Sequence, residues 1–180
     1  DGSRKSVNQL TIRATEFTVG PEGPSRMPAQ LPPRTGYTYA AEFNADEAIA
    51  LGGGMVEFSK PVPMYVDNFL NLPTGSLMPL GFLNPKNGFW EQMPNAIVIK
   101  VLGLDTNQNA ILDVRGHGVA ATAQELAVHN ITASELKILG SKYVAGKSFW
   151  RGASTHFSTY DFNGTITRPD LPPPPPPVVS

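Results

Sequence analysis

Apolar and polar side chains alternate along several short segments of the chain, which is the pattern of half-buried β-strands. The alternation is clearest over residues 10–19, which read LTIRATEFTV and are rich in β-branched side chains. Further segments with strand character are 36–43, 55–58, 62–66, 88–93, 96–104 and 148–157. The segment 96–104 is almost continuously apolar, so we expect it to be buried on both faces.

Proline, glycine and a few helix signals divide these segments. The loop that follows residue 19 is rich in proline and cannot be a central strand, because proline lacks an amide donor. Residues 68–85 alternate apolar residues with proline and glycine, which indicates short strands and tight corners. Residues 46–51 favour a short helix that ends at the glycines 52–54.

A second helix is predicted after residue 132. Thr132 and Glu135 have the spacing of a capping box, in which each side chain satisfies the other residue's backbone amide. Leu136, Leu139 and Tyr143 then share one face of the helix. The whole pattern predicts a mainly β fold, either a sandwich or bent antiparallel sheets, with one or two short helices.

Composition narrows the class of protein. The chain has 180 residues, the size of one domain with tails, and its 41% hydrophobic content suffices for a core. Its 14 basic and 15 acidic residues are scattered, so the basic stripe of a nucleic-acid-binding protein is missing. No cysteine is present, which excludes disulfides and cysteine nucleophiles. No apolar run reaches the roughly 20 residues that cross a bilayer, so we expect no membrane span.

The C-terminal end differs from the rest of the chain. Residues 172–177 are six consecutive prolines, which predict a stiff polyproline II spacer. We place the boundary near Arg168, giving a β-rich domain over residues 1–168 and a proline-rich linker over residues 169–180.

Three segments resemble the domain that precedes the YD repeats in large bacterial Rhs-type proteins. They are residues 11–42 (TIRATEFTVGPEGPSRMPAQLPPRTGYTYAAE), 58–82 (FSKPVPMYVDNFLNLPTGSLMPLGF) and 149–163 (FWRGASTHFSTYDFN). The resemblance implies one unit of a secreted or cell-surface bacterial protein, with the rest of a large repeat protein as its partner.

The most specific chemical motif is His156-Phe157-Ser158. It resembles the cut site of self-cleaving domains of the ZU5 and FIIND type. The resemblance implies that Ser158 attacks the Phe157 carbonyl, with His156 as the base. Histidine suits that role because its ordinary pKa of about 6.5 lets it accept a proton at neutral pH. The C-terminal piece would then remain docked as a strand and be the partner of the larger piece. The opposing interpretation is a packed aromatic residue in a structural strand.

Residues 105–113 form a weaker candidate, a calcium loop. Side-chain or carbonyl oxygens fall at alternating positions, as in loops that bind hard cations. The ligands would be Asp105, Asn107, Asn109, Ile111 and Asp113. An Asn-rich hairpin explains the same residues, and the self-cleavage chemistry requires no cofactor.

The remaining polar residues have simpler interpretations. His117 and His129 are expected in loops or on the surface, without the spacing of a zinc site. The main alternative function is a structural or adhesive β domain that spaces or caps a repeat shell and catalyses nothing. A carbohydrate-binding sandwich is a third interpretation, in which Tyr37, Tyr39 and Trp90 would supply exposed aromatic rings.

Overall fold

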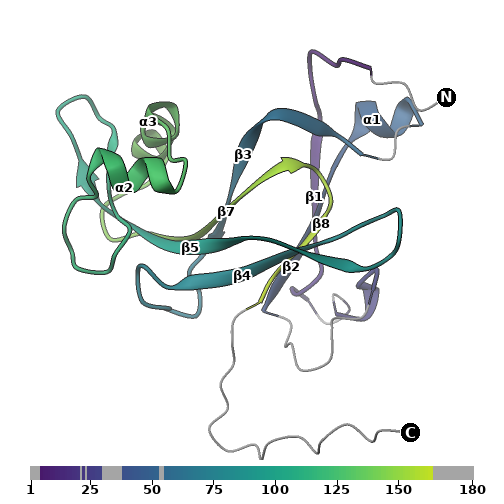
Figure 1. The fold of residues 1–180 in the computed structure, drawn as a ribbon, viewed down its shortest axis with the longest axis horizontal. Coiled ribbons are helices and arrows are strands. Elements are labelled where there is room, and N and C mark those ends of the chain that lie inside the picture. The colour runs from purple at the N-terminus through teal and green to yellow at the C-terminus, as the bar shows by residue number, and fades with distance from the viewer. Residues whose placement is uncertain (1–4, 21, 23, 30–37, 53–54, 164–180) are drawn as a thin grey trace, which may run out of the picture.

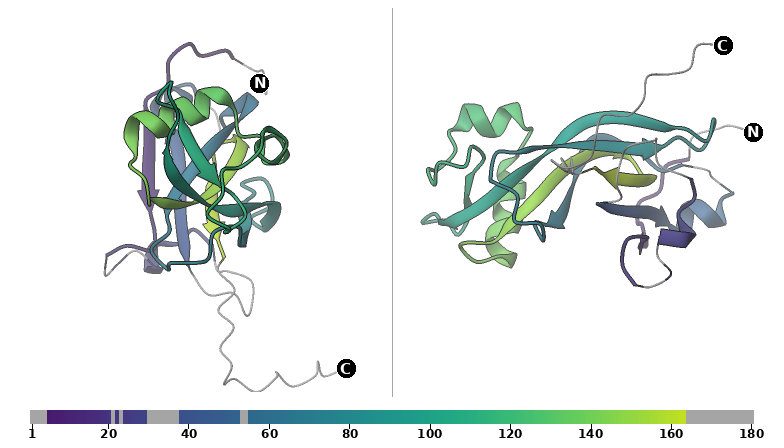
Figure 2. Two further views of the ribbon diagram at one scale, coloured as in Figure 1. Left: turned by 90° about the vertical axis from the view of Figure 1, so that its left-hand side faces the viewer. Right: turned by 90° about the horizontal axis from the view of Figure 1, so that it is seen from below.

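The computed structural model describes residues 5–20, 22, 24–29, 38–52 and 55–163. Its strands form one curled antiparallel sheet (Figures 1 and 2). They are β1 (Ile12–Glu16), β2 (Tyr39–Ala45), β3 (Glu57–Asp67), β4 (Leu77–Leu83), β5 (Trp90–Leu104), β6 (Ala110–Asp113), β7 (Ser148–His156) and β8 (Thr159–Phe162). The helices are α1 (Asp46–Ala50), α2 (Ala123–Val128), α3 (Ala133–Lys142) and the 3₁₀ turn η1 (Pro24–Arg26). The mainly β prediction is confirmed in its bent-sheet form, with three short α-helices.

The order of strands across the sheet is β1-β2-β8-β4-β5-β7-β3, and β6 pairs with β5 outside this path. The last strand in the sequence, β8, therefore lies inside the sheet, between β2 and β4. The helices α2 and α3 lie together at one end of the molecule, and α1 lies at the other (Figure 1). This topology brings the N-terminal and C-terminal parts of the described chain into direct contact.

Two of the predicted strand boundaries are wrong for the same reason. Residues 88–93 and 96–104 belong to one strand, β5, and the segments around Lys60-Pro61 belong to one strand, β3. In each case the strand passes a proline at an irregularity in its register. A bulge tolerates proline because one residue there is not required to donate to the ladder.

The alternation over residues 10–19 predicted a strand, and β1 confirms it, but the half-burial typical of such a pattern is not found. All five residues of β1 are exposed. β1 is an edge strand and pairs with β2 alone among the described strands. Phe17, just beyond β1, is the buried apolar side chain of this segment.

The core has two parts, on opposite faces of β5 and β7. One part lies under α2 and α3 and includes Ile99, Leu139 and Phe149. The other includes Val98, Trp150, Tyr160 and Phe162. Neighbouring residues on a strand point to opposite faces, so Phe149 and Trp150 enter different parts of the core. The expectation that residues 96–104 are buried on both faces is confirmed for residues 96–99 and Val101, but it is wrong for Lys100 and Leu104, which are exposed.

α3 begins as predicted, but half of its capping box is wrong. The Thr132 hydroxyl accepts a hydrogen bond from the Glu135 amide. The Glu135 carboxylate forms a buried ion pair with Arg151 of β7 instead of returning to Thr132. The reciprocal capping box is at α2, between Thr122 and Glu125. Glu135 therefore attaches α3 to the sheet.

No helix in the described part of the chain is both long and apolar enough to span a membrane.

Candidate self-cleavage site at the β7–β8 corner

The predicted cut site lies at the corner between two strands that are not paired with each other. β7 ends at His156 and β8 begins at Thr159. Phe157 and Ser158 therefore carry the chain from β7, which pairs with β3 and β5, to β8, which pairs with β2 and β4. We call residues 156–158 the β7–β8 corner.

Phe157 is held on both its backbone and its ring. Its amide donates to the Val56 carbonyl at 2.9 Å. Its ring stacks on Phe43, with centroids 6.0 Å apart, and meets the edge of Phe58 at 4.8 Å. The carbonyl carbon that Ser158 would attack is therefore carried by a residue that the fold fixes in place.

Ser158 is also bound to its surroundings. Its hydroxyl donates to the Leu83 carbonyl at 2.8 Å, and its own carbonyl accepts from the Phe43 amide at 3.0 Å. The hydroxyl must therefore leave Leu83 before it can act as a nucleophile. The rotation exchanges one neutral hydrogen bond, whose net value is about 1 kcal/mol.

His156 does not contact the Ser158 hydroxyl by any hydrogen bond recorded among the described residues. Its ring lies against Phe82, with centroids 4.6 Å apart, and Nδ1 is 3.4 Å from the Tyr160 hydroxyl. The sequence therefore places the two predicted reactive residues on one corner, but their side chains are directed to different partners. Catalytic hydrogen bonds are often long before the reaction begins.

Tyr160 and Ser154 form a polar cluster with His156 that the sequence analysis did not identify. The Tyr160 hydroxyl is 2.8 Å from Ser154 Oγ and also contacts the His156 carbonyl. Ser154 Oγ in turn donates to that carbonyl at 3.0 Å. Burial raises the pKa of Tyr160 to about 12, and the contact with Ser154 offsets a part of this rise. The phenol therefore keeps its proton at neutral pH and can donate.

A signal for this cluster exists in the sequence. Ser154 and His156 are two residues apart in a strand, so their side chains share a face. Tyr160 is the second residue of the next strand. The connection between them required knowledge of how the chain turns at Phe157 and Ser158.

The predicted calcium ligands fall in the β5–β6 hairpin, as the Asn-rich alternative implied. Asp105 lies before the turn and accepts hydrogen bonds from the Asn107 and Asn109 amides, each at 2.8 Å. Asp113 lies at the far end of β6, and Ile111 is within that strand, paired with Gly103. Asp105 and Asp113 therefore do not share one loop. Calcium binding stays a prediction, and no group of three or more His, Asp or Glu side chains suited to a metal is found in the part of the chain the structure describes.

Both aspartates stabilise their loops as anions. Hydrogen bonds from Asn109, first through its side chain, lower the pKa of Asp105. Burial raises the pKa of Asp113, but the backbone amides of residues 115–118 outweigh it, so the pKa is lowered overall. These amides close the loop after β6 around the Asp113 carboxylate.

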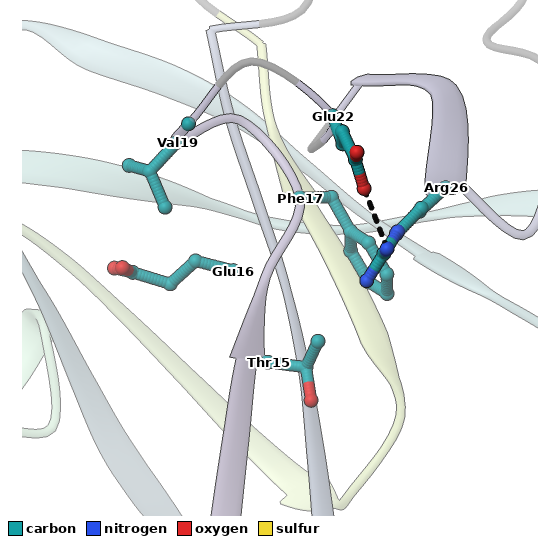
Figure 3. Close-up of a pocket in the computed structure, with 7 residues that line it drawn as sticks. Thr15, Glu16, Phe17, Val19, Glu22 and Arg26 are labelled. Carbon is teal, nitrogen blue, oxygen red and sulfur yellow. Dashed lines mark hydrogen bonds and ion pairs between the residues drawn. The ribbon is translucent and has the colours of Figure 1, made fainter.

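Three other residues named in the sequence analysis lie on other elements: His129 follows α2, Tyr39 begins β2 and Trp90 begins β5. The His129 carbonyl accepts a hydrogen bond from Arg151, and Tyr39 donates to Glu16. Trp90 is partly buried, whereas Tyr37 and the proline run 172–177 lie outside the described residues. A shallow cavity of about 280 Å³ beside β1 and η1 contains none of the predicted reactive residues (Figure 3). The Glu22–Arg26 ion pair lies across it.

Comparison of the chain with protein-family models, curated proteins and solved structures finds no match in any of the three. The resemblance to Rhs-type proteins and to ZU5 domains therefore rests on the sequence segments alone. The bacterial and extracellular assignment that it implies stays a prediction.

Proposed function

We propose that the domain cuts its own backbone once, between Phe157 and Ser158, and that both fragments stay associated. The observation that supports this proposal is the position of β8. The strand begins one residue after Ser158 and has hydrogen-bonded neighbours on both sides, β2 and β4. Tyr160 and Phe162 of β8 are also buried in the core. A cut at this point leaves a C-terminal fragment that the sheet retains without a peptide bond.

The chemistry is an acyl shift followed by hydrolysis. The Ser158 hydroxyl rotates away from Leu83, gives its proton to His156 and attacks the Phe157 carbonyl carbon. The carbon–nitrogen bond then breaks, His156 returns the proton to the departing amine, and an ester joins Phe157 to the Ser158 oxygen. Water hydrolyses the ester, which gives a carboxylate on Phe157 and restores the Ser158 hydroxyl.

Tyr160 has a positioning role in this scheme. Its hydroxyl is the polar group beside His156 Nδ1, and it also contacts the His156 carbonyl. A partner at Nδ1 determines the orientation of an imidazole ring and which nitrogen accepts the proton. The neighbouring rings of Phe82 and Tyr160 restrict the ring further.

Intact mass under denaturing conditions tests the proposal. The wild-type chain should yield fragments 1–157 and 158–180, and these should co-elute in a native size-exclusion run. Ser158→Ala should give one uncut mass, His156→Ala should cut more slowly, and the control Thr155→Ala, at an exposed position of β7, should cut like wild type. A cut at the same bond in Ser158→Ala would assign it to an external protease.

A second function, a structural β domain without catalysis, is favoured by the hydrogen bond from Ser158 to Leu83. In that case the hydroxyl is a structural donor that joins the corner to β4. Wild-type protein would then show one uncut mass after days at neutral pH. Ser158→Ala would lower the free energy of unfolding by about 1 kcal/mol and have no other effect.

A further inference from the structure

Asp161 is a buried acid in the middle of β8. It is fully buried and lies on the face of the sheet opposite to Tyr160 and Phe162. Its neighbours in register are small, Ala40 on β2 and Gly81 on β4. Among the described residues, neither of its carboxyl oxygens has a hydrogen-bond partner. A carboxylate in this place is shielded from bulk solvent and has no donor among the described residues to stabilise its charge.

Two further polar groups without partners accompany it. In the described chain, the buried side-chain atoms that lack a partner are those two oxygens, Trp90 Nε1 and Asn163 Oδ1. Trp90 lies over Gly81, since a Cβ added to that glycine would be 3.8 Å from the indole ring. Asn163 follows Asp161 by two residues. The unsatisfied polar atoms of the described residues thus gather around one strand.

The charged groups that the structure describes on the same face have other partners than Asp161. β2 contributes Glu42, which accepts a hydrogen bond from Asn44, and β1 contributes Arg13, which pairs with Asp46. The Glu22–Arg26 pair lies near Phe17 (Figure 3). β4 contributes Gly81 and Leu83, which do not titrate, and β5 contributes the neutral Gln92.

We propose that Asp161 is a proton-dependent lock on β8: the protonated acid lets the strand stay inside the sheet, and loss of the proton to solvent weakens its attachment to β2 and β4. Burial raises the pKa of Asp161 to about 7, and the Asn163 side chain offsets a part of this rise without forming a hydrogen bond of normal geometry. The lock therefore operates near neutral pH. It belongs to the uncut chain as much as to the cut one.

The direction of the effect follows from proton linkage. An aspartate in an unfolded chain has a pKa of about 4, so between pH 4 and 7 the folded state holds a proton that the unfolded state has lost. Stability is therefore greatest below pH 4 as far as this group is concerned, and it falls as pH rises to 7. The unfolding equilibrium constant should increase about tenfold for each pH unit in this window and level off above it.

The test uses the Ser158→Ala chain, so that its outcome does not depend on the cut. Urea unfolding at pH 5, 6, 7 and 8 should show the midpoint falling with pH. Adding Asp161→Asn, which cannot ionise, should remove most of that fall. Adding Asp113→Asn instead should leave it in place, because Asp113 is a buried aspartate whose pKa is lowered. Equal pH dependence with and without Asp161→Asn would overturn the proposal.

A direct titration covers the case in which Asp161→Asn does not fold. The carboxyl ¹³C chemical shift of Asp161 in labelled Ser158→Ala protein should change with pH, with a midpoint near pH 7. A midpoint below pH 5 would overturn the proposal. One consequence rests on the proposed function: in cut wild-type protein, fragment 158–180 should dissociate faster at pH 8 than at pH 5. Absence of a cut would remove that consequence and leave the titration result unchanged.

Discussion

The Tyr160 hydroxyl contacts the carbonyl of His156, across the corner that holds the proposed cut site. The same hydroxyl is the polar neighbour of His156 Nδ1. One phenol therefore binds both the backbone and the side chain of the residue that we propose as the base. Since Tyr160 is itself fully buried, it links the geometry of the corner to the packing of the core.

Tyr160→Phe should separate positioning from folding. Removing the hydroxyl leaves Ser154 and the His156 carbonyl short of one partner and should cost about 1–3 kcal/mol of unfolding free energy. The cut should slow, because the His156 ring loses the hydroxyl beside Nδ1 that orients it. Cleavage time courses at pH 7, with unfolding curves of the same proteins, measure this. Ser154→Ala is the matched control, since it disturbs the same cluster but leaves the contact between Tyr160 and Nδ1. Identical cleavage rates for wild type and a folded Tyr160→Phe protein would contradict the positioning role.

Gly140→Ala should destabilise the protein, although alanine normally favours a helix. α3 packs so closely on the β5–β6 hairpin that an added Cβ at Gly140 would contact the Gln108 carbonyl and lie 2.9 Å from the Ala110 amide nitrogen. Overpacking of this kind costs about 1–3 kcal/mol, which exceeds the gain of up to about 1 kcal/mol in helix propensity. Urea unfolding measures the difference. Gly103→Ala, where an added Cβ meets nothing within 4 Å, should change stability by less than about 0.5 kcal/mol.

The buried ion pair between Glu135 and Arg151 should be costly to break from one side. Both side chains are nearly inaccessible, with exposed fractions of 6% and 5%. Arg151→Met leaves a buried carboxylate without its cation and should cost about 3–5 kcal/mol. The double variant Arg151→Met with Glu135→Gln removes both charges and should be more stable than Arg151→Met alone. Equilibrium unfolding of the three proteins tests this, and a double variant less stable than Arg151→Met would be evidence against the interpretation.

His129 should give the domain a loss of stability in acid. Burial, followed by the nearby Arg151, lowers the pKa of His129 below its ordinary value. The unfolded chain therefore binds a proton more readily, and the stability from neutral His129 is present above about pH 6.5 and is lost as pH falls. Thermal unfolding from pH 7 to 5 should show a smaller decrease for His129→Asn than for wild type. The effect is opposite in sign to that of Asp161.

Local signals in the sequence predicted much of the fold. The mainly β class, the start of α3 at Thr132 and the helix at residues 46–50 depend on neighbouring residues, and all three are confirmed. The Asn-rich hairpin between β5 and β6 was likewise one of the alternatives that neighbouring residues indicated, and the structure contains it. Burial was harder to predict from the sequence than secondary structure. β1 has the alternation of a half-buried strand, but it lies at the edge of the sheet and all its residues are exposed.

The partners of the corner residues could not be predicted, since they depend on contacts between distant strands. The acceptor for Ser158 is Leu83, which is 75 residues earlier in the chain. The carboxylate of Glu135 could satisfy its own helix, as the capping box predicted, but Arg151 is a stronger partner and becomes available after β7 packs on α3. Asp161 carries no motif, and its unusual environment comes from the small residues that β2 and β4 place beside it.

The position of β8 also constrains when the protein can fold. Among the described strands, β1 and β2 reach the rest of the sheet through β8, which is the last to leave the ribosome. During synthesis the β1–β2 pair and the rest of the sheet therefore stay separate, each with an unpaired strand edge, until residues 159–162 emerge. A chain that stops at residue 158 would lack the strand that joins them. Emergence of β8 is thus the event that closes this fold.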